Sequence, residues 1–300
     1  MKRRFFLYIL LFFSIFFLIF LLYFLNKNKN YLIEKFEESK NAFVVLTRGY
    51  DNFEKYNSLI ERNKSIYDVF YSKLQENNKY KYDIIIFNEG NITLEQQKYI
   101  QNKTPYLPLI FITIKMYDNN FKNKNICPET VLSNSFSNGY KNMCYFWSID
   151  FLNYLKDYNY IIRIDEDCII EKLYIDIIDN YKNNEIMFSS PSYQDNDADD
   201  VIVGMNQLFN NYLIEHNIPQ KNLLKMPYTN FMIVNIYYFN NNNTVKDVLN
   251  IIKESNCIFS NRWGDLPIWG YILSYFIDKK YFIEDKNIVY YHGSHDKKIN

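Results

Sequence analysis

Residues 160–167 read Tyr-Ile-Ile-Arg-Ile-Asp-Glu-Asp, an apolar run that ends in three acidic side chains. The apolar part predicts a buried strand over residues 160–164, and ligands of open α/β sheets collect beyond the carboxyl ends of such strands. Asp165 and Asp167 follow that strand two residues apart, so both carboxylates can face one hard cation such as Mg²⁺ or Mn²⁺. A cation held in this way keeps coordination sites free for diphosphate oxygens, which a nucleotide-sugar transferase requires. A solvated acidic turn is the alternative interpretation.

Further apolar runs and helical patterns surround this strand. We expect strands at residues 43–47, 82–87 and 186–188, and helices at 51–63, with Asp51 as a possible cap, 172–182, 201–216, 244–255 and 266–277. Strands that alternate with helices predict an α/β fold whose mainly parallel sheet is flanked by helices on both faces. Only seven glycines are present in 300 residues, which argues against a dinucleotide-binding or Walker loop.

The first 25 residues predict a membrane anchor. Residues 5–25 contain one polar side chain, Ser14, and 21 helical residues at about 1.5 Å each cross a hydrocarbon core of about 30 Å. A cleaved signal peptide is the alternative, but its apolar region would be shorter and would end in small residues. Here the run ends in Asn-Lys-Asn-Lys instead.

Basic residues set the expected orientation of this anchor. Lys2, Arg3 and Arg4 precede the apolar run, which favours a cytoplasmic N-terminus. The expected organisation is a cytoplasmic tail at residues 1–4, a transmembrane anchor at 5–25, a stem at 26–40 and one lumenal domain at 41–300.

Composition narrows the function classes. The 34 basic and 34 acidic residues give a formal net charge of zero, so a nucleic-acid partner attracted by a basic field has no support. The four cysteines allow two disulfides in any of three connectivities if the lumenal compartment is oxidising. Their spacing is not the tight spacing of a zinc site.

Two further positions near the C-terminus attract attention. His292 follows an apolar run, and a neutral imidazole suits Mn²⁺ as a third ligand, although a surface histidine would look the same. In Arg262-Trp263-Gly264-Asp265-Leu266-Pro267, Asp265 can cap the helix that follows, with Pro267 in its first turn. Trp263 is either a core residue or a platform for a sugar ring.

Six segments together resemble the fungal α-1,2-mannosyltransferase family, glycosyltransferase family 15. They are residues 43–48, 140–146, 163–167, 230–231, 262–267 and His292, and they recur in this order over about residues 40–295. The resemblance implies a type II Golgi membrane enzyme of the GT-A fold class. It also implies GDP-mannose as donor, Mn²⁺ as cofactor, a glycan or glycoprotein acceptor, and retention at the anomeric carbon.

The resemblance implies a metal site at the acidic turn. The family's acidic ligand falls on Asp165, which is shorter by one methylene than the usual glutamate, and its companion acid falls on Asp167. Glu166 replaces the proline that normally stands between them. His292 matches the metal-binding histidine.

The resemblance also implies roles around the donor and acceptor. Arg48 and Arg163 match arginines near the donor diphosphate, and Tyr140 matches a substrate-binding tyrosine. Asp265 matches the acid of the Arg-Trp-Gly-Asp motif. The expected catalytic groups are therefore Asp265, Arg163 and Tyr140, while Arg48, Arg163, Tyr140 and Trp263 are expected to bind the donor.

One departure from the family pattern bears on mechanism. The family motif Asn-Phe-Glu-Ile reads Asn230-Phe231-Met232-Ile233 here, and methionine can neither attack an anomeric carbon nor carry a proton. A double displacement through this position is therefore unavailable. An enzyme with front-face attack remains, as do a membrane-anchored sugar-binding pseudoenzyme and a transferase that uses another nucleotide sugar.

Overall fold

The computed structural model describes residues 40–293 except 76–81, 118–126, 128–129 and 196. The predicted cytoplasmic tail, the anchor at 5–25 and all of the stem but Lys40 lie outside the described residues. Among the described helices, none is both long enough and apolar enough to cross a membrane.

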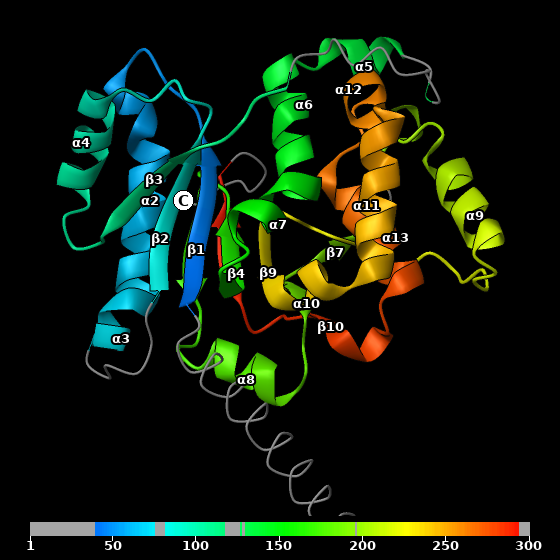
Figure 1. Cartoon of the computed structure of the whole chain (residues 1–300). Coiled ribbons are helices and arrows are strands. Elements are labelled where there is room, and N and C mark those ends of the chain that lie inside the picture. Colours follow the sequence, from blue (N-terminus) through cyan, green and yellow to red (C-terminus); the bar gives the residue numbers. More distant parts are fainter. Residues whose placement is uncertain (1–39, 76–81, 118–126, 128–129, 196, 294–300) are drawn as a thin grey trace, which may run out of the picture. The chain divides into compact units, whose positions relative to one another are not determined.

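The central element is a seven-stranded sheet in the order β10-β6-β9-β4-β1-β2-β3 (Figure 1). Strands β3, β2, β1 and β4 are parallel neighbours, and β10 is parallel to β6, whereas β9 runs antiparallel between β4 and β6. The predicted mainly parallel α/β sheet is thus confirmed. Its strands are β1 Lys40–Thr47, β2 Tyr82–Asn88, β3 Leu109–Thr113, β4 Tyr158–Ile164, β6 Phe188–Ser190, β9 Phe231–Asn235 and β10 Phe282–Glu284.

Two small antiparallel ribbons accompany this sheet. β5 Cys168–Lys172 pairs with β11 Val289–His292, and β7 Tyr193–Gln194 pairs with β8 Met226–Pro227. The first ribbon begins directly after the acidic turn that follows β4, so it brings the C-terminal strand to the predicted metal site.

The helices cover both faces of the sheet. Strand residues alternate between two core regions: Ala42 and Val44 pack on one face, while Phe43 and Val45 pack on the other. In Figure 1, α2 and α4 lie on one side of the strands and α6, α11, α12 and α13 on the other. The helices are α2 Asn57–Ile66, α3 Ser72–Gln75, α4 Leu94–Lys103, α5 Val131–Ser135, α6 Asn138–Tyr145, α7 Phe151–Tyr154, α8 Ile177–Asn183, α9 Met205–Glu215, α10 Ile236–Asn241, α11 Asn243–Ser255, α12 Cys257–Asn261 and α13 Asp265–Phe276.

Several expected boundaries shift. The cap after β1 is Asn52 rather than Asp51, because the Asn52 side chain accepts the backbone N–H of Glu54 at 2.9 Å and starts a short 3₁₀ turn before α2. The helix expected over 172–182 is shorter and begins at Ile177. Residues 168–172 form β5 and pair with β11 instead. The strand expected at 186–188 begins at Phe188.

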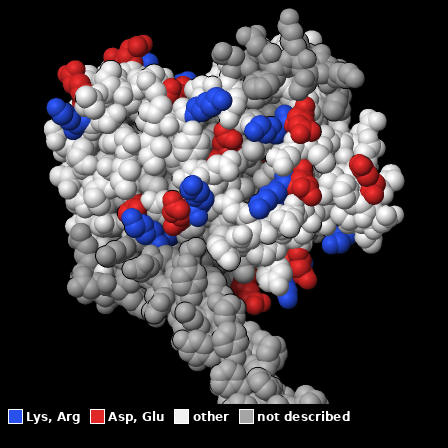
Figure 2. All heavy atoms as spheres, in the orientation of Figure 1, with Lys and Arg blue, Asp and Glu red and all other residues white. Residues whose placement is uncertain are grey.

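Charged side chains are mixed on the surface. On the face drawn in Figure 2, Lys and Arg lie among Asp and Glu, and neither sign forms a continuous region. A surface of this kind offers no broad field for steering a polyanion toward that face.

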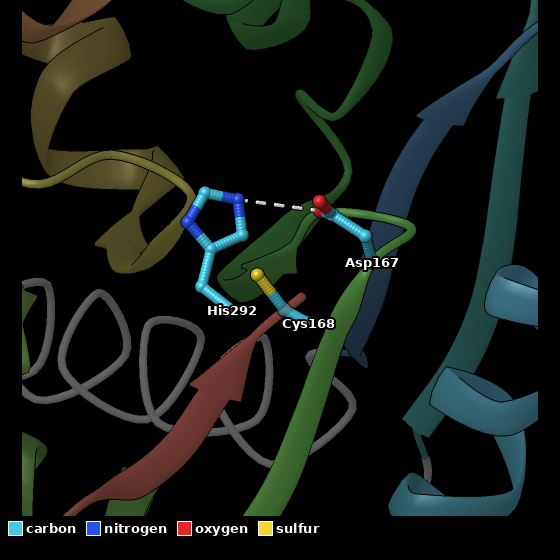
Figure 3. Close-up of side chains that lie close together, drawn as sticks. All are labelled: Asp167, Cys168 and His292. Atoms are coloured by element: carbon cyan, nitrogen blue, oxygen red, sulfur yellow. Dashed lines mark ion pairs between the residues drawn. The ribbon is translucent and has the colours of Figure 1, made fainter. Parts of the chain in front are cut away.

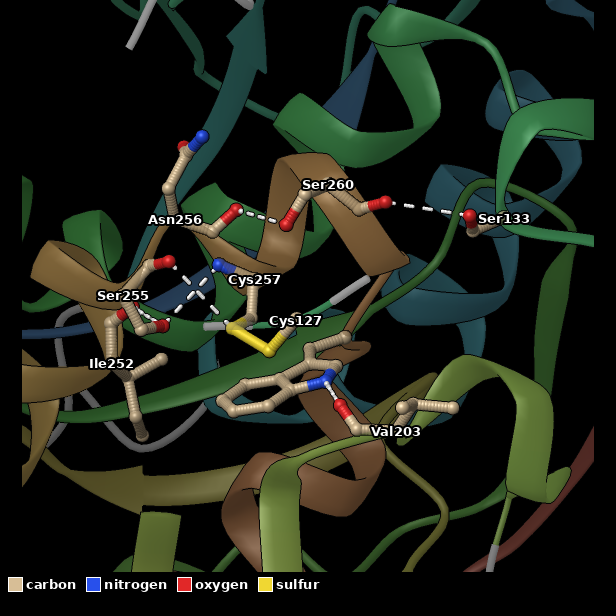
Figure 4. The surroundings of a disulfide bond; sticks show 9 residues. Cys127, Ser133, Val203, Ile252, Ser255, Asn256, Cys257 and Ser260 are labelled. Atoms are coloured by element: carbon tan, nitrogen blue, oxygen red, sulfur yellow. Dashed lines mark hydrogen bonds between the residues drawn. A yellow bond between two sulfur atoms is a disulfide. The ribbon is translucent and has the colours of Figure 1, made fainter. Parts of the chain in front are cut away.

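The four cysteines form one disulfide rather than the two that their number allowed. Cys127 is bonded to Cys257, the first residue of α12 (Figure 4). Cys144 and Cys168 are buried free thiols. The bond spans 130 residues of sequence, so it restricts the unfolded chain strongly.

Replacing both bonded cysteines, as Cys127→Ser with Cys257→Ser, should lower the free energy of unfolding by about 2–5 kcal/mol. Urea denaturation of the variant and the wild type measures this loss. Peptide mapping without reductant should recover the two peptides joined, with Cys144 and Cys168 alkylated only after unfolding. A map in which Cys144 or Cys168 is cross-linked would contradict the assignment.

Candidate active site

The site forms where the carboxyl ends of β1, β2 and β4 meet. The antiparallel β9 begins at the same edge, and the backbone N–H of Asp165 donates to the carbonyl of Asn230 at 2.9 Å. A hollow of about 530 Å³ lies beyond these strand ends. Its lining includes Arg48, Tyr50, Glu89, Tyr140, Glu166 and Asp167.

A second hollow of about 330 Å³ adjoins the first. Tyr140, Met143 and Asp165 line both, so the two share a wall at the acidic turn. Arg163, Asp197, Tyr228, Arg262, Asp265 and His292 contribute to the second hollow. The structure therefore gathers most of the predicted site residues around two connected spaces.

Arg163 is the buried centre of this arrangement. It is 2% exposed, and its guanidinium lies 4.3 Å from the centre of the Trp147 ring. Nε donates to Asp165 Oδ1 at 2.9 Å and Nη2 donates to Asp165 Oδ2 at 3.2 Å, while Nη1 donates to Asp265. Arg163 therefore pairs two carboxylates and lines the second hollow, and its expected role near the donor diphosphate stays a prediction.

Both carboxylate oxygens of Asp165 accept hydrogen bonds from Arg163. Burial raises the pKa of Asp165, the Arg163 guanidinium opposes that shift, and the carboxylates of Asp265 and Asp167 add to it. Both of its oxygens already accept from one cation, so ligation of a metal by Asp165 remains a prediction.

Asp167 and His292 are brought together as expected. His292 Nε2 lies 3.4 Å from Asp167 Oδ1 (Figure 3). The Tyr228 hydroxyl is hydrogen-bonded to His292 Nδ1 at 3.1 Å. The contact depends on a close backbone approach, in which the Gly293 N–H donates to the Asp167 carbonyl at 2.8 Å. A Cβ at position 293 would lie only 3.1 Å from that carbonyl oxygen, which favours glycine there.

These two side chains fit a divalent metal. A carboxylate oxygen and an imidazole nitrogen are both common ligands of Mn²⁺, and Tyr228 fixes the ring so that Nε2 faces the carboxylate. Asp167 lines the first hollow and His292 the second, so a metal between them would be open to both spaces. The buried thiol of Cys168 stands beside them, a neighbour that sequence reading missed.

Glu166, which replaces the family proline, points away from this pair. Its Oε2 accepts the Thr47 hydroxyl at 2.6 Å, and its Oε1 accepts the Tyr50 hydroxyl. Burial and the Glu166 carboxylate raise the pKa of Tyr50 to about 12. The exposed Arg48 guanidinium lies 5.3 Å from the Tyr50 ring centre, so Glu166 and Tyr50 together support the arginine expected at the diphosphate.

Tyr140, which lines both hollows, is hydrogen-bonded to Arg262 of the second hollow. Arg262 Nη2 donates to the Tyr140 hydroxyl at 2.6 Å, and Nη1 donates to Asp197 Oδ2 at 2.6 Å. Burial raises the pKa of Tyr140 to about 12, so its hydroxyl is neutral at neutral pH. Arg262 has a φ of 64°, a left-handed conformation that a non-glycine residue adopts at some cost. Sequence reading gave Arg262 no role.

One curated protein is similar to this chain in sequence. No family model matches the chain. It is 25% identical to "Probable mannosyltransferase MNT3" of Candida albicans, across 88% of this chain and 73% of that protein. The predicted resemblance to the Ktr/Mnt mannosyltransferases of glycosyltransferase family 15 is confirmed by this relative.

Solved structures share the fold. Core-mannan synthase A (CmsA/Ktr4) from Aspergillus fumigatus, in its Mn/GDP form, matches with a TM-score of 0.68 at 17% identity, over 84% of this chain and 74% of that one. Ktr4p from S. cerevisiae in complex with GDP matches with a TM-score of 0.67 at 18% identity, over 85% and 71%. The fold of the chain is therefore α/β and GT-A-like.

Trp263 and Asp265 differ from two expectations drawn from the sequence. Trp263 is fully buried and donates from Nε1 to the Val203 carbonyl at 3.0 Å, so it is a core residue and corrects the expectation of a donor-binding platform. Asp265 is the first residue of α13, and the cap position belongs to Gly264, which makes no side-chain cap. The Asp265 carboxylate accepts a hydrogen bond from the Arg163 guanidinium instead of capping the helix.

Met232 lies beneath the second hollow. It is fully buried on β9 directly opposite Arg163 of β4, so the two side chains share a face of the sheet. It lines neither hollow, and its neighbours belong to the apolar core. The Met232 side chain therefore contributes to core packing and does not face either hollow.

Arg163→Met should destabilise the protein by about 3–5 kcal/mol near neutral pH, because two carboxylates lose their buried partner. Burial already raises the pKa of Asp165, and loss of the cation should raise it further. A raised carboxyl pKa contributes stability below its unfolded value of about 3.9 that is lost as pH rises through the folded value. The deficit should therefore shrink between pH 7 and about pH 4, as measured by urea unfolding.

Arg62→Met is the matched control. Arg62 is also fully buried, but it donates to the backbone carbonyls of Ile164 and Val44 and to the Asn63 amide oxygen. Its deficit should not shrink on acidification. Equal pH profiles for the two variants would contradict the pairing of Arg163 with the carboxylates.

Proposed function

We propose that this protein transfers mannose from GDP-mannose to a mannose hydroxyl of a protein-linked glycan, forming an α-1,2 linkage with retained configuration. The observation that carries the proposal is the Asp167 and His292 pair, 3.4 Å apart at the junction of two hollows beyond the strand ends. The relatives support it, since one is named a probable mannosyltransferase and the solved structures were obtained with Mn/GDP or GDP.

The first hollow suits the nucleotide. Arg48 is exposed at its edge, and a planar guanidinium pairs well with phosphate oxygens. Asp167 and His292 would hold Mn²⁺, which neutralises the charge of the departing diphosphate when bound. The neutral Tyr140 hydroxyl lines both spaces and can donate a hydrogen bond to a sugar or phosphate oxygen between them.

The second hollow suits the acceptor sugar. The carboxylates that line it are Asp165, Asp197 and Asp265, and each is paired with an arginine. Because an arginine engages each of these carboxylates, we infer that the acceptor proton passes to a phosphate oxygen of the leaving GDP. Front-face attack needs no enzyme nucleophile and agrees with methionine at position 232.

The compartment is part of the proposal. A disulfide between Cys127 and Cys257 supports an oxidising environment such as the secretory pathway. We infer that residues 5–25 anchor the protein in the Golgi membrane with the described domain in the lumen. Protease treatment of sealed microsomes should then spare the domain unless detergent is added.

Full-length protein given GDP-mannose, Mn²⁺ and an α-mannoside should form an α-linked dimannoside, and NMR of the product should show retention and the 1,2 linkage. Parallel reactions with other nucleotide sugars test the donor. Binding of GDP-mannose or glycan with no turnover on any donor would instead favour the sugar-binding alternative that Met232 suggests.

Met232→Glu and Met232→Gln form a matched pair that tests the mechanism. The two variants add similar polar volume, and only glutamate adds a carboxylate. Because position 232 is buried under Arg163 and lines neither hollow, we expect neither variant to exceed the wild-type rate. If Met232→Glu outpaces Met232→Gln and the wild type in initial-rate assays, a carboxylate here takes part in catalysis and the front-face assignment is wrong.

A further inference from the structure

We propose that Cys168 is a ligand of the metal at the Asp167 and His292 pair, and that it gives this site a preference for thiophilic divalent cations such as Zn²⁺ over Mn²⁺. The inference deepens the proposed function, on which it rests, by naming the class of metal that the site selects.

The ribbon of β5 and β11 places the three side chains together. Cys168 and His292 are directly opposite in its antiparallel register, so their side chains project from the same face. Asp167 precedes Cys168 in the chain. One ligand atom from each of the three lies within 4.8 Å of the other two, and in Figure 3 the sulfur projects toward the space between imidazole and carboxylate.

The spacing suits a four-coordinate metal. Ligand atoms about 2.0–2.2 Å from a tetrahedral metal lie about 3.4 Å apart, and His292 Nε2 and Asp167 Oδ1 are separated by 3.4 Å. Three protein ligands with an open fourth position are the pattern of catalytic zinc sites. The fourth position would face the hollows that Asp167 and His292 line, where diphosphate oxygens can enter.

Neighbouring groups are oriented for a sulfur ligand. Cys168 is fully buried, and the side-chain amide of the buried Asn230 donates from Nδ2 to its Sγ at 3.6 Å. The Tyr290 hydroxyl donates to Asn230 Oδ1 at 2.9 Å, which fixes the amide with its N–H toward the sulfur. Such an outer hydrogen bond stabilises negative charge on a ligating sulfur, as Tyr228 orients His292 on the other side.

The ligand atoms of the site determine which metal it prefers. Sulfur favours Zn²⁺ and Co²⁺, whereas Mn²⁺ prefers oxygen and stands lowest in affinity among these ions. As the sulfur–metal bond forms, the thiol proton leaves to solvent. Mn²⁺ would gain little from Cys168 and would depend on Asp167 and His292.

Metal binding to the full-length protein, without reductant, tests the proposal. Addition of Co²⁺ to the wild type should produce the near-ultraviolet sulfur-to-cobalt charge-transfer absorption, and Zn²⁺ should abolish it by competition. Calorimetry should show tighter binding of Zn²⁺ than of Mn²⁺. In Cys168→Ser the absorption should vanish and Zn²⁺ affinity fall by at least about 100-fold, because loss of even an outer partner costs about 10- to 100-fold.

Cys144→Ser is the matched control, since Cys144 is the other buried free thiol and is outside the cluster. It should leave the absorption and both affinities unchanged, and Cys168→Ser should leave Mn²⁺ affinity within about 3-fold, because Mn²⁺ gains little from sulfur. No absorption in the wild type, or its loss in Cys144→Ser, would overturn the proposal, and the wild-type result does not depend on any variant folding. The readouts need no turnover, so a failed transferase assay leaves them interpretable.

Discussion

The guanidinium of Arg163 lies buried between the carboxylates of Asp165 and Asp265, and much of the site depends on that one cation. It joins the end of β4 to the start of α13, two elements a hundred residues apart in the chain, and it packs over Trp147 from the segment after α6. Burying a charge is costly unless it is paired and hydrogen-bonded. Here two carboxylates share the cation, so none of the three charges is buried without a partner.

This pairing explains how the acidic turn works as a unit. Three consecutive acids would repel one another if they shared a space. Each acid instead has its own partner. Asp165 pairs with Arg163, and Asp167 lies beside His292. Glu166 accepts hydrogen bonds from the hydroxyls of Thr47 and Tyr50. The turn therefore connects the loop after β1, the core of the sheet and the ribbon at once. Glu166 ties the turn to Thr47 and Tyr50 through two hydrogen bonds.

The parts of this structure that sequence reasoning predicted are those whose causes are local. The strand before Asp165 is apolar and ends in acids, so both its burial and its place at the sheet edge were predictable. Asp265 shows the limit: its position favours a helix cap, but a distant buried cation takes the carboxylate. Cys168 and His292 lie more than a hundred residues apart, and only the register of β5 with β11 brings them face to face. The spacing of residues along the chain does not predict that register.

The same charge arrangement constrains the proposed reaction. A carboxylate acts as a base or nucleophile when its charge is available, and every carboxylate lining the second hollow is held by an arginine. The position at which the resemblance implied a glutamate holds Met232, packed in the core under Arg163. The strongest uncommitted base near an acceptor hydroxyl would thus be the departing diphosphate itself. A site in which the protein fixes its own charges and leaves proton transfer to the substrate favours attack from the leaving-group side, and hence retention.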